Sequence, residues 1–138
     1  MIVVDSSVWI DTLNGRKTIQ THMLEAMVIA GLTIAVGDLI LVEVLQGTRG
    51  DRGYRSAQSL FDAFQPLQIS DHHVAIQAAR NYRLLRTRGI TIRKTIDTLI
   101  ATRCIIDRLP LLYSDRDFDP FVEHLGLIPA LAADTGVN

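Results

Sequence analysis

The sequence predicts an α/β fold with a mostly parallel sheet whose strands are joined by crossover helices. Short Ile/Val/Leu-rich runs, typical of buried strands, alternate along the chain with segments of helical spacing. Strands separated by helices in this way pair in parallel and need crossover connections. The length of 138 residues, without an internal repeat or a linker, predicts one domain over residues 1–138.

The first half of the chain provides three of the five predicted strands. The five strand-like runs are residues 2–4, 32–35, 64–69, 111–113 and 125–128. A helix over 7–13 follows the first run and ends at Asn14-Gly15, a turn signal. A second helix over 18–30 places Ile19, Met23 and Met27 on one face, and Gly31 ends it.

The remaining helices follow from their end signals and periodicity. Residues 39–46 would also suit a buried strand, but Asp38 as N-cap and Gly47 as a C-terminal signal favour a helix. Helices are also expected over 51–63, 71–88 and 95–108. In the second of these an apolar stripe is formed by Val74, Ala78, Tyr82 and Leu85.

Composition narrows the class of protein. Apolar residues make up 48% and charged residues 21%, which is typical of a globular domain and not of a disordered one. The one cysteine, Cys104, excludes an intramolecular disulfide, fits a reducing cytoplasm and has apolar neighbours that favour packing over reactivity. The longest uncharged stretch, residues 26–37, is too short to cross a bilayer, and no secretory leader is expected.

Basic residues are concentrated in one segment although the net charge is −1. Eight of the fourteen lie between positions 80 and 108: Arg80, Arg83, Arg86, Arg88, Arg93, Lys94, Arg103 and Arg108. Guanidinium groups suit phosphate oxygens, so this segment is a candidate for contacts to a phosphate backbone. A solvated helix face is the simpler alternative.

Acidic residues occupy places where charge is costly. Asp5 follows the first strand, Glu43 lies within the apolar run LILVEVL, and Asp97 lies in the first turn of the 95–108 helix. Asp115 follows the fourth strand, with Asp117 two residues later. Taken singly, the aspartates are explained as helix caps or helix-dipole partners. Glu43 needs a partner, a metal or a cleft, because an unpaired buried carboxylate costs several kcal/mol.

The predicted topology brings these acids together. The carboxyl ends of the first and fourth strands would be adjacent at the switch point, so Asp5 and Asp115 would meet there, within reach of Glu43 and Asp97. Converging carboxylates require neutralisation, and oxygen-only ligation favours Mg²⁺ or Mn²⁺. Zinc is disfavoured by one cysteine and four scattered histidines. Such a site suits metal-dependent hydrolysis of phosphodiesters.

Four stretches together resemble the PIN-domain ribonucleases, and among them the VapC-type toxins of toxin–antitoxin modules. The stretches are IVVDSSVWID, GDLILVEVLQG, RKTIDTLIAT and LLYSDRDFDPFVEHLGL, in that order from Ile2 to Ile128. The resemblance implies a three-layer α/β/α fold with a five-stranded sheet of order 3-2-1-4-5. It implies Asp5, Glu43, Asp97 and Asp115 as catalytic, metal-holding acids, Asp117 as a further ligand and Ser7 as a weaker candidate. Which of the alternating acids 115, 117 and 119 reaches the metal stays open.

The resemblance also implies partners. These are an RNA substrate, commonly tRNA, a VapB-type antitoxin and a second copy of the chain in a homodimer. The antitoxin would cross a groove lined by the helices of residues 18–63, including Arg49, Arg52 and Arg55, and place a basic side chain in the acidic pocket. Two alternatives stay open: an RNA-processing PIN nuclease without a toxin role, and a non-catalytic RNA-binding PIN domain.

Other acidic or nucleotide-binding folds are disfavoured by specific residues. Haloacid-dehalogenase phosphatases need a second Asp two residues after the first, where this chain has Ser7. Response-regulator receivers need a lysine after the last strand, but the two lysines here are Lys17 and Lys94. The glycine-rich phosphate-binding loops of dinucleotide and P-loop proteins are missing from the sequence.

Overall fold

The computed structural model of the protein describes residues 1–131 and contains a parallel four-stranded sheet. Its strands are β1 (Ile2–Val4), β2 (Ile34–Gly37), β3 (Gln65–Leu67) and β4 (Leu111–Leu112), in the order β3-β2-β1-β4. The α/β class, the parallel pairing and the order of these four strands confirm the prediction. Residues 132–138 of the predicted domain lie outside the described part.

The predicted fifth strand is wrong among the described residues. Gly126, with a φ of 82°, ends a helix that runs up to Leu125, so half of the 125–128 run is not extended. The chain then passes beside β4 and makes a single parallel bridge, between Leu111 and Pro129. Pro129 has no backbone N–H to donate, which limits the ladder at this point. The segment therefore occupies the fifth position of the sheet without forming a strand.

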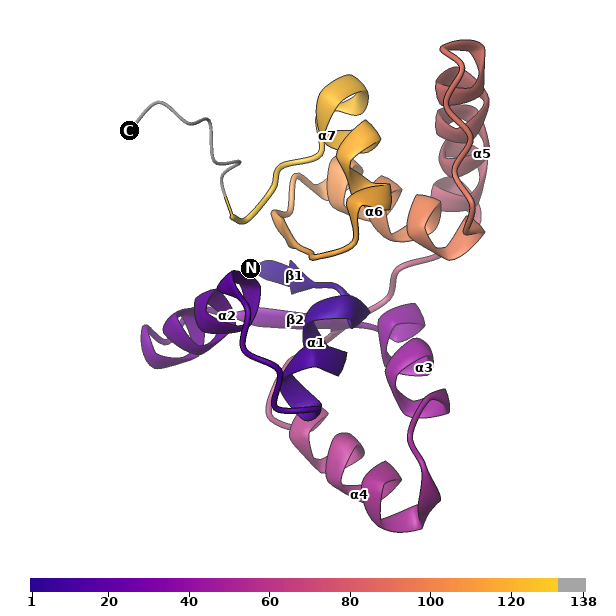
Figure 1. Ribbon diagram of the computed structural model, residues 1–138. Helices are drawn as coiled ribbons and strands as arrows, with labels where there is room; N and C mark the ends of the chain where they lie inside the picture. Colours follow the sequence, from indigo (N-terminus) through magenta and orange to yellow (C-terminus); the bar gives the residue numbers. More distant parts are fainter. Residues whose placement is uncertain (132–138) are drawn as a thin grey trace.

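Within residues 1–131, four helices precede β3 and three follow it. The first group is α1 (Ser6–Leu13), α2 (Ile19–Ile29), α3 (Asp38–Gln46) and α4 (Gly50–Phe61). The second is α5 (His72–Thr87), α6 (Thr95–Asp107) and α7 (Asp119–Leu125), with the 3-10 turn η1 (Arg116–Phe118) before α7. Figure 1 shows the two groups on opposite sides of β1 and β2, as expected for a three-layer fold. The bounds of η1 and α7 were not predicted from the sequence, but Asp115 was a candidate cap for a following helix, and it does cap η1.

The helix over residues 39–46 is confirmed, but its predicted N-cap is wrong. Gly37 is the N-cap of α3, and Asp38 is the first helical residue. The Asp38 carboxylate accepts hydrogen bonds from the backbone N–H of Leu39 at 2.8 Å and of Ile69 at 2.9 Å. A Cβ at Gly37 would lie 2.6 Å from the Ile69 side chain, so only glycine fits here. Asp38 thus ties the start of α3 to the chain after β3.

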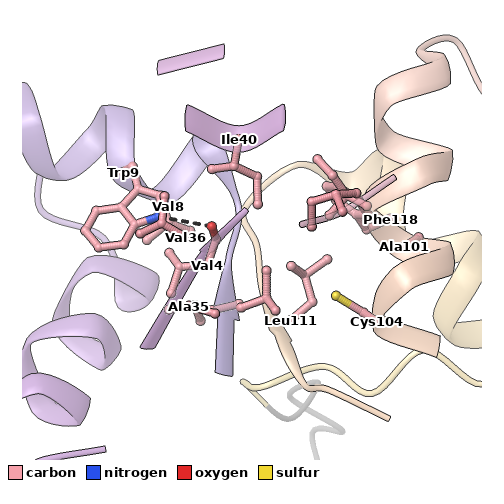
Figure 2. Close-up of a cluster of buried hydrophobic side chains, with 14 of the residues drawn as sticks. Val4, Val8, Trp9, Ala35, Val36, Ile40, Ala101, Cys104, Leu111 and Phe118 are labelled. Carbon is pink, nitrogen blue, oxygen red and sulfur yellow. Dashed lines mark hydrogen bonds between the residues drawn. The ribbon is translucent and has the colours of Figure 1, made fainter. Parts of the chain in front are cut away.

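The core is continuous through the sheet (Figure 2). Trp9 of α1, only 1% exposed, packs at 5.0 Å from the rings of Phe61 and Phe64, and its indole N–H donates to the carbonyl of Val4 at 3.0 Å. Phe118 and Cys104 lie on the other side of the strands in Figure 2. Burial raises the pKa of the Cys104 thiol to about 12, which supports the predicted packing role.

No helix within residues 1–131 has the length and apolar character needed to cross a membrane.

Candidate metal centre

The predicted acids come from both halves of the chain, and all but Glu43 lie at or near the end of a helix or strand. Asp5 follows β1 and caps α1, whereas Glu43 lies in the middle of α3. Asp97 lies in the first turn of α6, and Asp115 follows β4 at the start of η1. The β1 and β4 strands are paired, so their carboxyl ends bring Asp5 and Asp115 to the same edge of the sheet.

Asp5 uses one carboxylate oxygen for the fold and leaves the other without a partner. Its Oδ2 accepts from the Ser7 backbone N–H at 3.1 Å and from the Ser7 hydroxyl at 2.6 Å. The same hydroxyl oxygen accepts from the backbone N–H of Ser114 at 3.2 Å, which joins the start of α1 to the chain after β4. Asp5 Oδ1 is buried with no hydrogen-bond partner among the described residues.

Asp97 is a second buried acid of the site. It is 3% exposed, and its Oδ2 is buried without a partner in the described part of the chain. Burial first, and then the neighbouring carboxylates of Asp5, Asp115 and Glu43, raise the pKa of Asp97 to about 7. One carboxylate oxygen from each of Asp97, Asp115 and Asp117 lies within 4.8 Å of the others.

Glu43 reaches the same cluster from α3. The Ser6 hydroxyl donates to Glu43 Oε1 at 3.2 Å, which anchors the half-buried carboxylate next to the start of α1. Burial and the charge of Asp5 raise the pKa of Glu43. Burial also raises the pKa of Asp5, to which the Asp115 charge adds. Asp117 joins this site through its proximity to Asp97 and Asp115, and the charges of Asp5 and Asp115 act on Glu43 and Asp97. We refer to Asp5, Glu43, Asp97, Asp115 and Asp117 as the acidic cluster.

Asp119, the last of the three alternating acids, makes its hydrogen bond outside the acidic cluster. Asp119 Oδ1 accepts a hydrogen bond from the Tyr113 hydroxyl at 2.9 Å. Asp115 Oδ1 accepts from the backbone N–H of Asp117 at 2.9 Å, which caps η1 and leaves Oδ2 for other contacts. The geometry thus groups Asp115 and Asp117 with Asp97 and leaves Asp119 outside the group.

The residues fit a hard divalent cation. Two buried oxygens, Asp5 Oδ1 and Asp97 Oδ2, have no donor in the described structure, and leaving such atoms unsatisfied costs free energy. The ligand atoms that Asp97, Asp115 and Asp117 offer are carboxylate oxygens, which Mg²⁺ and Mn²⁺ prefer. A cation would satisfy the orphaned oxygens and reduce the repulsion that raises the pKa values.

Two basic side chains approach the acidic cluster from solvent. Arg93 Nη2 lies 3.1 Å from Asp117 Oδ2 and 3.2 Å from its Oδ1, and Lys94 Nζ lies 3.9 Å from Asp115 Oδ2. From the sequence alone, Arg93 and Lys94 were expected only as part of a basic segment that could contact phosphate. Their position immediately before the helix that carries Asp97 was the signal that would have placed them here.

The rest of the basic segment is divided among different contacts. Arg103 is 14% exposed and is held by Asp71, Asp107 and the carbonyl of Ile69, so its predicted availability to phosphate is wrong. Arg86 lies over the ring of Tyr82, and Arg88 contacts His124.

A groove of about 600 Å³ runs between α1, α3 and α4. Ile10 and Leu13 of α1 and Val44 of α3 line it, and none of the acidic-cluster residues is among its lining residues. Of the three arginines predicted to line it, Arg49 does so, and Arg52 and Arg55 are not among its lining residues.

Comparisons with known proteins match most of the chain. The model of the family described as PIN domain matches residues 2–122. Ribonuclease VapC11 of Mycobacterium tuberculosis and a VapC ribonuclease of Mycobacterium bovis are each 28% identical over 120 residues, which is 86% of this chain and 90% of theirs.

Solved structures with the same fold are similar over almost the whole chain. VapBC2 of Rickettsia felis, bound to a promoter DNA fragment, has a TM-score of 0.74 at 19% identity, covering 94% of this chain and 97% of that one. A toxin–antitoxin complex of Klebsiella pneumoniae has a TM-score of 0.64 at 16% identity, covering 93% and 96%. VapC20 of M. tuberculosis, a Sarcin-Ricin loop cleaving toxin, has a TM-score of 0.62 at 15% identity, covering 86% and 93%.

Proposed function

The chain belongs to the PIN-domain family, and from that premise we propose that it is a ribonuclease toxin of the VapC type, active with Mg²⁺ or Mn²⁺. The observation that carries the proposal is the acidic cluster with its two orphaned buried oxygens, Asp5 Oδ1 and Asp97 Oδ2. A non-catalytic RNA-binding domain would have no need to keep such destabilising atoms. The names of the curated relatives support ribonuclease activity.

In this proposal Asp5, Asp97, Asp115 and Asp117 hold the cation, and Glu43 completes the cluster from α3. When bound, the cation activates water and stabilises charge on the phosphoryl oxygens. Ser7 orients Asp5 through its 2.6 Å hydrogen bond, and Ser6 orients Glu43. Glu43 Oε2 remains available to accept a proton from the attacking water, because Ser6 engages only Oε1.

The substrate in this proposal is RNA, and the resemblance makes tRNA the first target to test. One structural neighbour is described as cleaving the Sarcin-Ricin loop, which provides a second candidate RNA. Incubation of the purified protein with total tRNA and with a synthetic Sarcin-Ricin loop distinguishes the two. Site-specific cuts in one RNA and not in the other would identify the target.

The proposed protein partner is a VapB-type antitoxin. Two structural neighbours are toxin–antitoxin assemblies of the same fold. The groove between α1, α3 and α4 is lined by apolar Ile10 and Leu13 and by Val44, the residue after Glu43 on α3. An antitoxin segment with apolar residues followed by an arginine or lysine would fill this groove and neutralise the acidic cluster. The homodimer and the cytoplasmic location stay predictions from the sequence.

The metal dependence is tested with Asp97→Asn, which keeps the side-chain shape and removes the charge. We expect RNA cleavage to fall by about 10²–10³-fold, as for the loss of one group that stabilises a transition state. Circular dichroism of the variant should match that of the wild type. Exposed Asp62→Asn is the matched control and should cleave normally. Full activity of the wild type in excess EDTA would falsify the metal assignment.

The toxin role needs a test in cells. Induced expression of the wild-type chain should stop growth, and co-expression of the antitoxin should restore it. Asp5→Ala should allow growth, because it removes both the cap of α1 and one cluster oxygen. If an enzyme that cleaves RNA in vitro leaves growth unchanged, the RNA-processing alternative replaces the toxin role.

A further inference from the structure

The dipeptide Arg93-Lys94 covers the acidic cluster where α6 begins. Arg93 pairs with Asp117 and Lys94 pairs with Asp115, and these are the two basic side chains within 4.0 Å of the clustered carboxylates in residues 1–131. Lys94 also lowers the pKa of both Glu43 and Asp97, so its charge acts on acids other than its partner Asp115. In the metal-free protein, the Arg93 and Lys94 side chains balance part of the negative charge of the five clustered acids.

Both basic side chains contact their acids from the solvent side. The side chains of Arg93 and Lys94 are 77% and 57% exposed, whereas those of Asp117 and Asp115 are 20% and 27% exposed. Arg93 uses only its Nη2 atom, which contacts both oxygens of Asp117, and its Nε and Nη1 atoms have no hydrogen-bond partner in the described structure. Exposed ion pairs of this kind contribute little to stability, so the side chains can leave their acids readily.

Arg103 shows the contrasting arrangement in the same basic segment. Its guanidinium is 14% exposed and contacts two carboxylates and a backbone carbonyl, which fixes it against α5 and the chain after β3. Arg103 therefore serves the fold. Arg93 and Lys94 are more exposed and each pairs with a single acid. Their charges therefore act on the acidic cluster and contribute little to the fold.

We propose that Arg93 and Lys94 form an exchangeable charge clamp, which pairs with Asp117 and Asp115 when the cluster holds no divalent cation and binds RNA backbone phosphates when it does. The clamp rests on the proposed function, because it assumes the same cation site and an RNA substrate. A divalent cation competes with the clamp for the two carboxylates. The released guanidinium and ammonium groups then lie beside the bound cation, where phosphate oxygens of the substrate would arrive.

The clamp has opposite effects on the two ligands. Neutral residues at both positions should tighten binding of the cation to the RNA-free protein, because a competitor is removed. The same change should weaken binding of RNA, because two phosphate contacts are lost. A purely structural role for the dipeptide would shift both affinities in the same direction or leave both unchanged.

The chain contains its own matched control. The tetrapeptide RKTI occurs at 16–19 and again at 93–96, each time at the start of a helix. Arg16 is 75% exposed and contacts Asp11, near the other end of α1 from Asp5. The test variant is Arg93→Gln/Lys94→Met, and Arg16→Gln/Lys17→Met removes the same charges away from the acidic cluster.

Two titrations at pH 8.5 test the clamp. Isothermal titration with MnCl₂ in the absence of RNA should show binding tighter by about two- to fivefold per pair in the test variant. Binding of a single-stranded phosphorothioate RNA in Mn²⁺, followed by fluorescence anisotropy over a salt series, should be weaker. Its log–log salt slope should be smaller by about 1.4, since each lost contact to a single strand contributes about 0.7.

The control variant should match the wild type in both titrations. Unchanged or weaker Mn²⁺ binding in the test variant would overturn the competition with the cation, and an unchanged salt slope would overturn the contact with phosphates. A wild-type protein that binds no Mn²⁺ and cleaves no RNA would instead overturn the proposed function and the clamp with it. Unfolding curves of all three proteins exclude misfolding as the cause.

Discussion

At the scale of single residues, Asp5 serves the fold and the acidic cluster with different atoms. Its Oδ2 caps α1 through Ser7, and its Oδ1 is buried without a partner among the described residues. The helix-cap interpretation and the metal-site interpretation of this residue are therefore compatible. The cap fixes the carboxylate so that its second oxygen has one orientation, which is what a metal ligand requires.

Ser7 is the positioning residue on which this arrangement depends. Ser7→Ala removes the 2.6 Å hydrogen bond to Asp5 and the acceptor for the Ser114 N–H. We expect the free energy of unfolding to fall by about 1–2 kcal/mol and kcat for RNA cleavage to fall by about 10–100-fold, with KM little changed. Urea denaturation and steady-state kinetics measure the two effects. Exposed Ser59→Ala should change neither, and a normal kcat in Ser7→Ala would show that Asp5 needs no support.

Asp97 makes the stability of the metal-free protein depend on pH. Its pKa is about 7 in the folded protein and 3.8 as the ordinary value. The folded state therefore holds this proton more tightly, and the stability that it contributes is present below pH 4 and is lost as the pH rises through 7. Unfolding in EDTA should become easier from pH 5 to pH 7, with a slope of up to about 1.4 kcal/mol per pH unit.

Asp97→Asn isolates this contribution. The amide cannot ionise, so the variant should lose the Asp97 part of the pH slope and be more stable than the wild type at pH 8. Asp62→Asn should keep the wild-type slope. Asp5 and Glu43 have raised pKa values too, so a smaller slope in the same direction should remain. An unchanged slope in Asp97→Asn would show that the Asp97 carboxyl is not the group that titrates.

At the scale of elements, the sequence predicted structure where local signals and burial agree. The Ile/Val runs and the helix-ending glycines placed β1, β4, α1 and α2 within two residues of their observed ends. The fifth strand failed because Leu125 and Gly126 also suit the end of a helix, and only contacts with the rest of the fold decide between the two. Asp38 failed as a cap because its carboxylate bonds to Ile69, 31 positions away.

The sequence also predicted only part of the candidate site. Acids at the ends of strands were predictable, because parallel strands bring their carboxyl ends to one edge. The pairing of Arg93 with Asp117 was not predictable, since it depends on the conformation of the chain between α5 and α6. The sequence likewise could not show that Asp119 turns away to Tyr113.

The groove between α1, α3 and α4 can be tested separately from the acidic cluster. Gly53 lines it, and a Cβ at this position meets no atom within 4 Å, so a larger residue fits the helix backbone without a clash. Gly53→Arg should fill the groove and weaken antitoxin binding by at least about tenfold, while RNA cleavage stays normal. Surface plasmon resonance with the co-expressed antitoxin measures the affinity.

Gly53→Ala is the control for the helix itself. It stabilises α4 by about 0.5–1 kcal/mol without occupying the groove, so antitoxin affinity should stay within about twofold of the wild type. If Gly53→Arg binds the antitoxin normally, the partner uses another surface, such as the apolar patch of Val28 and Ile29 on α2.

At the scale of the whole molecule, the acidic cluster joins the two halves of the chain. Asp5 and Glu43 come from the part before β3, and Asp97, Asp115 and Asp117 from the part after it. The sheet holds these halves together through the pairing of β1 with β4. Repulsion between the carboxylates opposes that pairing, so a cation bound among them would stabilise the whole fold and not one element alone.

This coupling predicts a cation-dependent melting temperature. A ligand that binds only the folded state at 100 times its dissociation constant adds about 2.7 kcal/mol, which for a domain of this size raises Tm by roughly 10 °C. Differential scanning calorimetry in MnCl₂ and in EDTA should show that rise for the wild type at pH 8. Asp97→Asn should show little of it, because the cluster loses an anionic ligand from α6. Exposed Glu123→Gln, on α7 and outside the cluster, should keep the full rise. An equal rise in Asp97→Asn would place the stabilising cation elsewhere on the molecule, and the two halves would then be held by the sheet and the core alone.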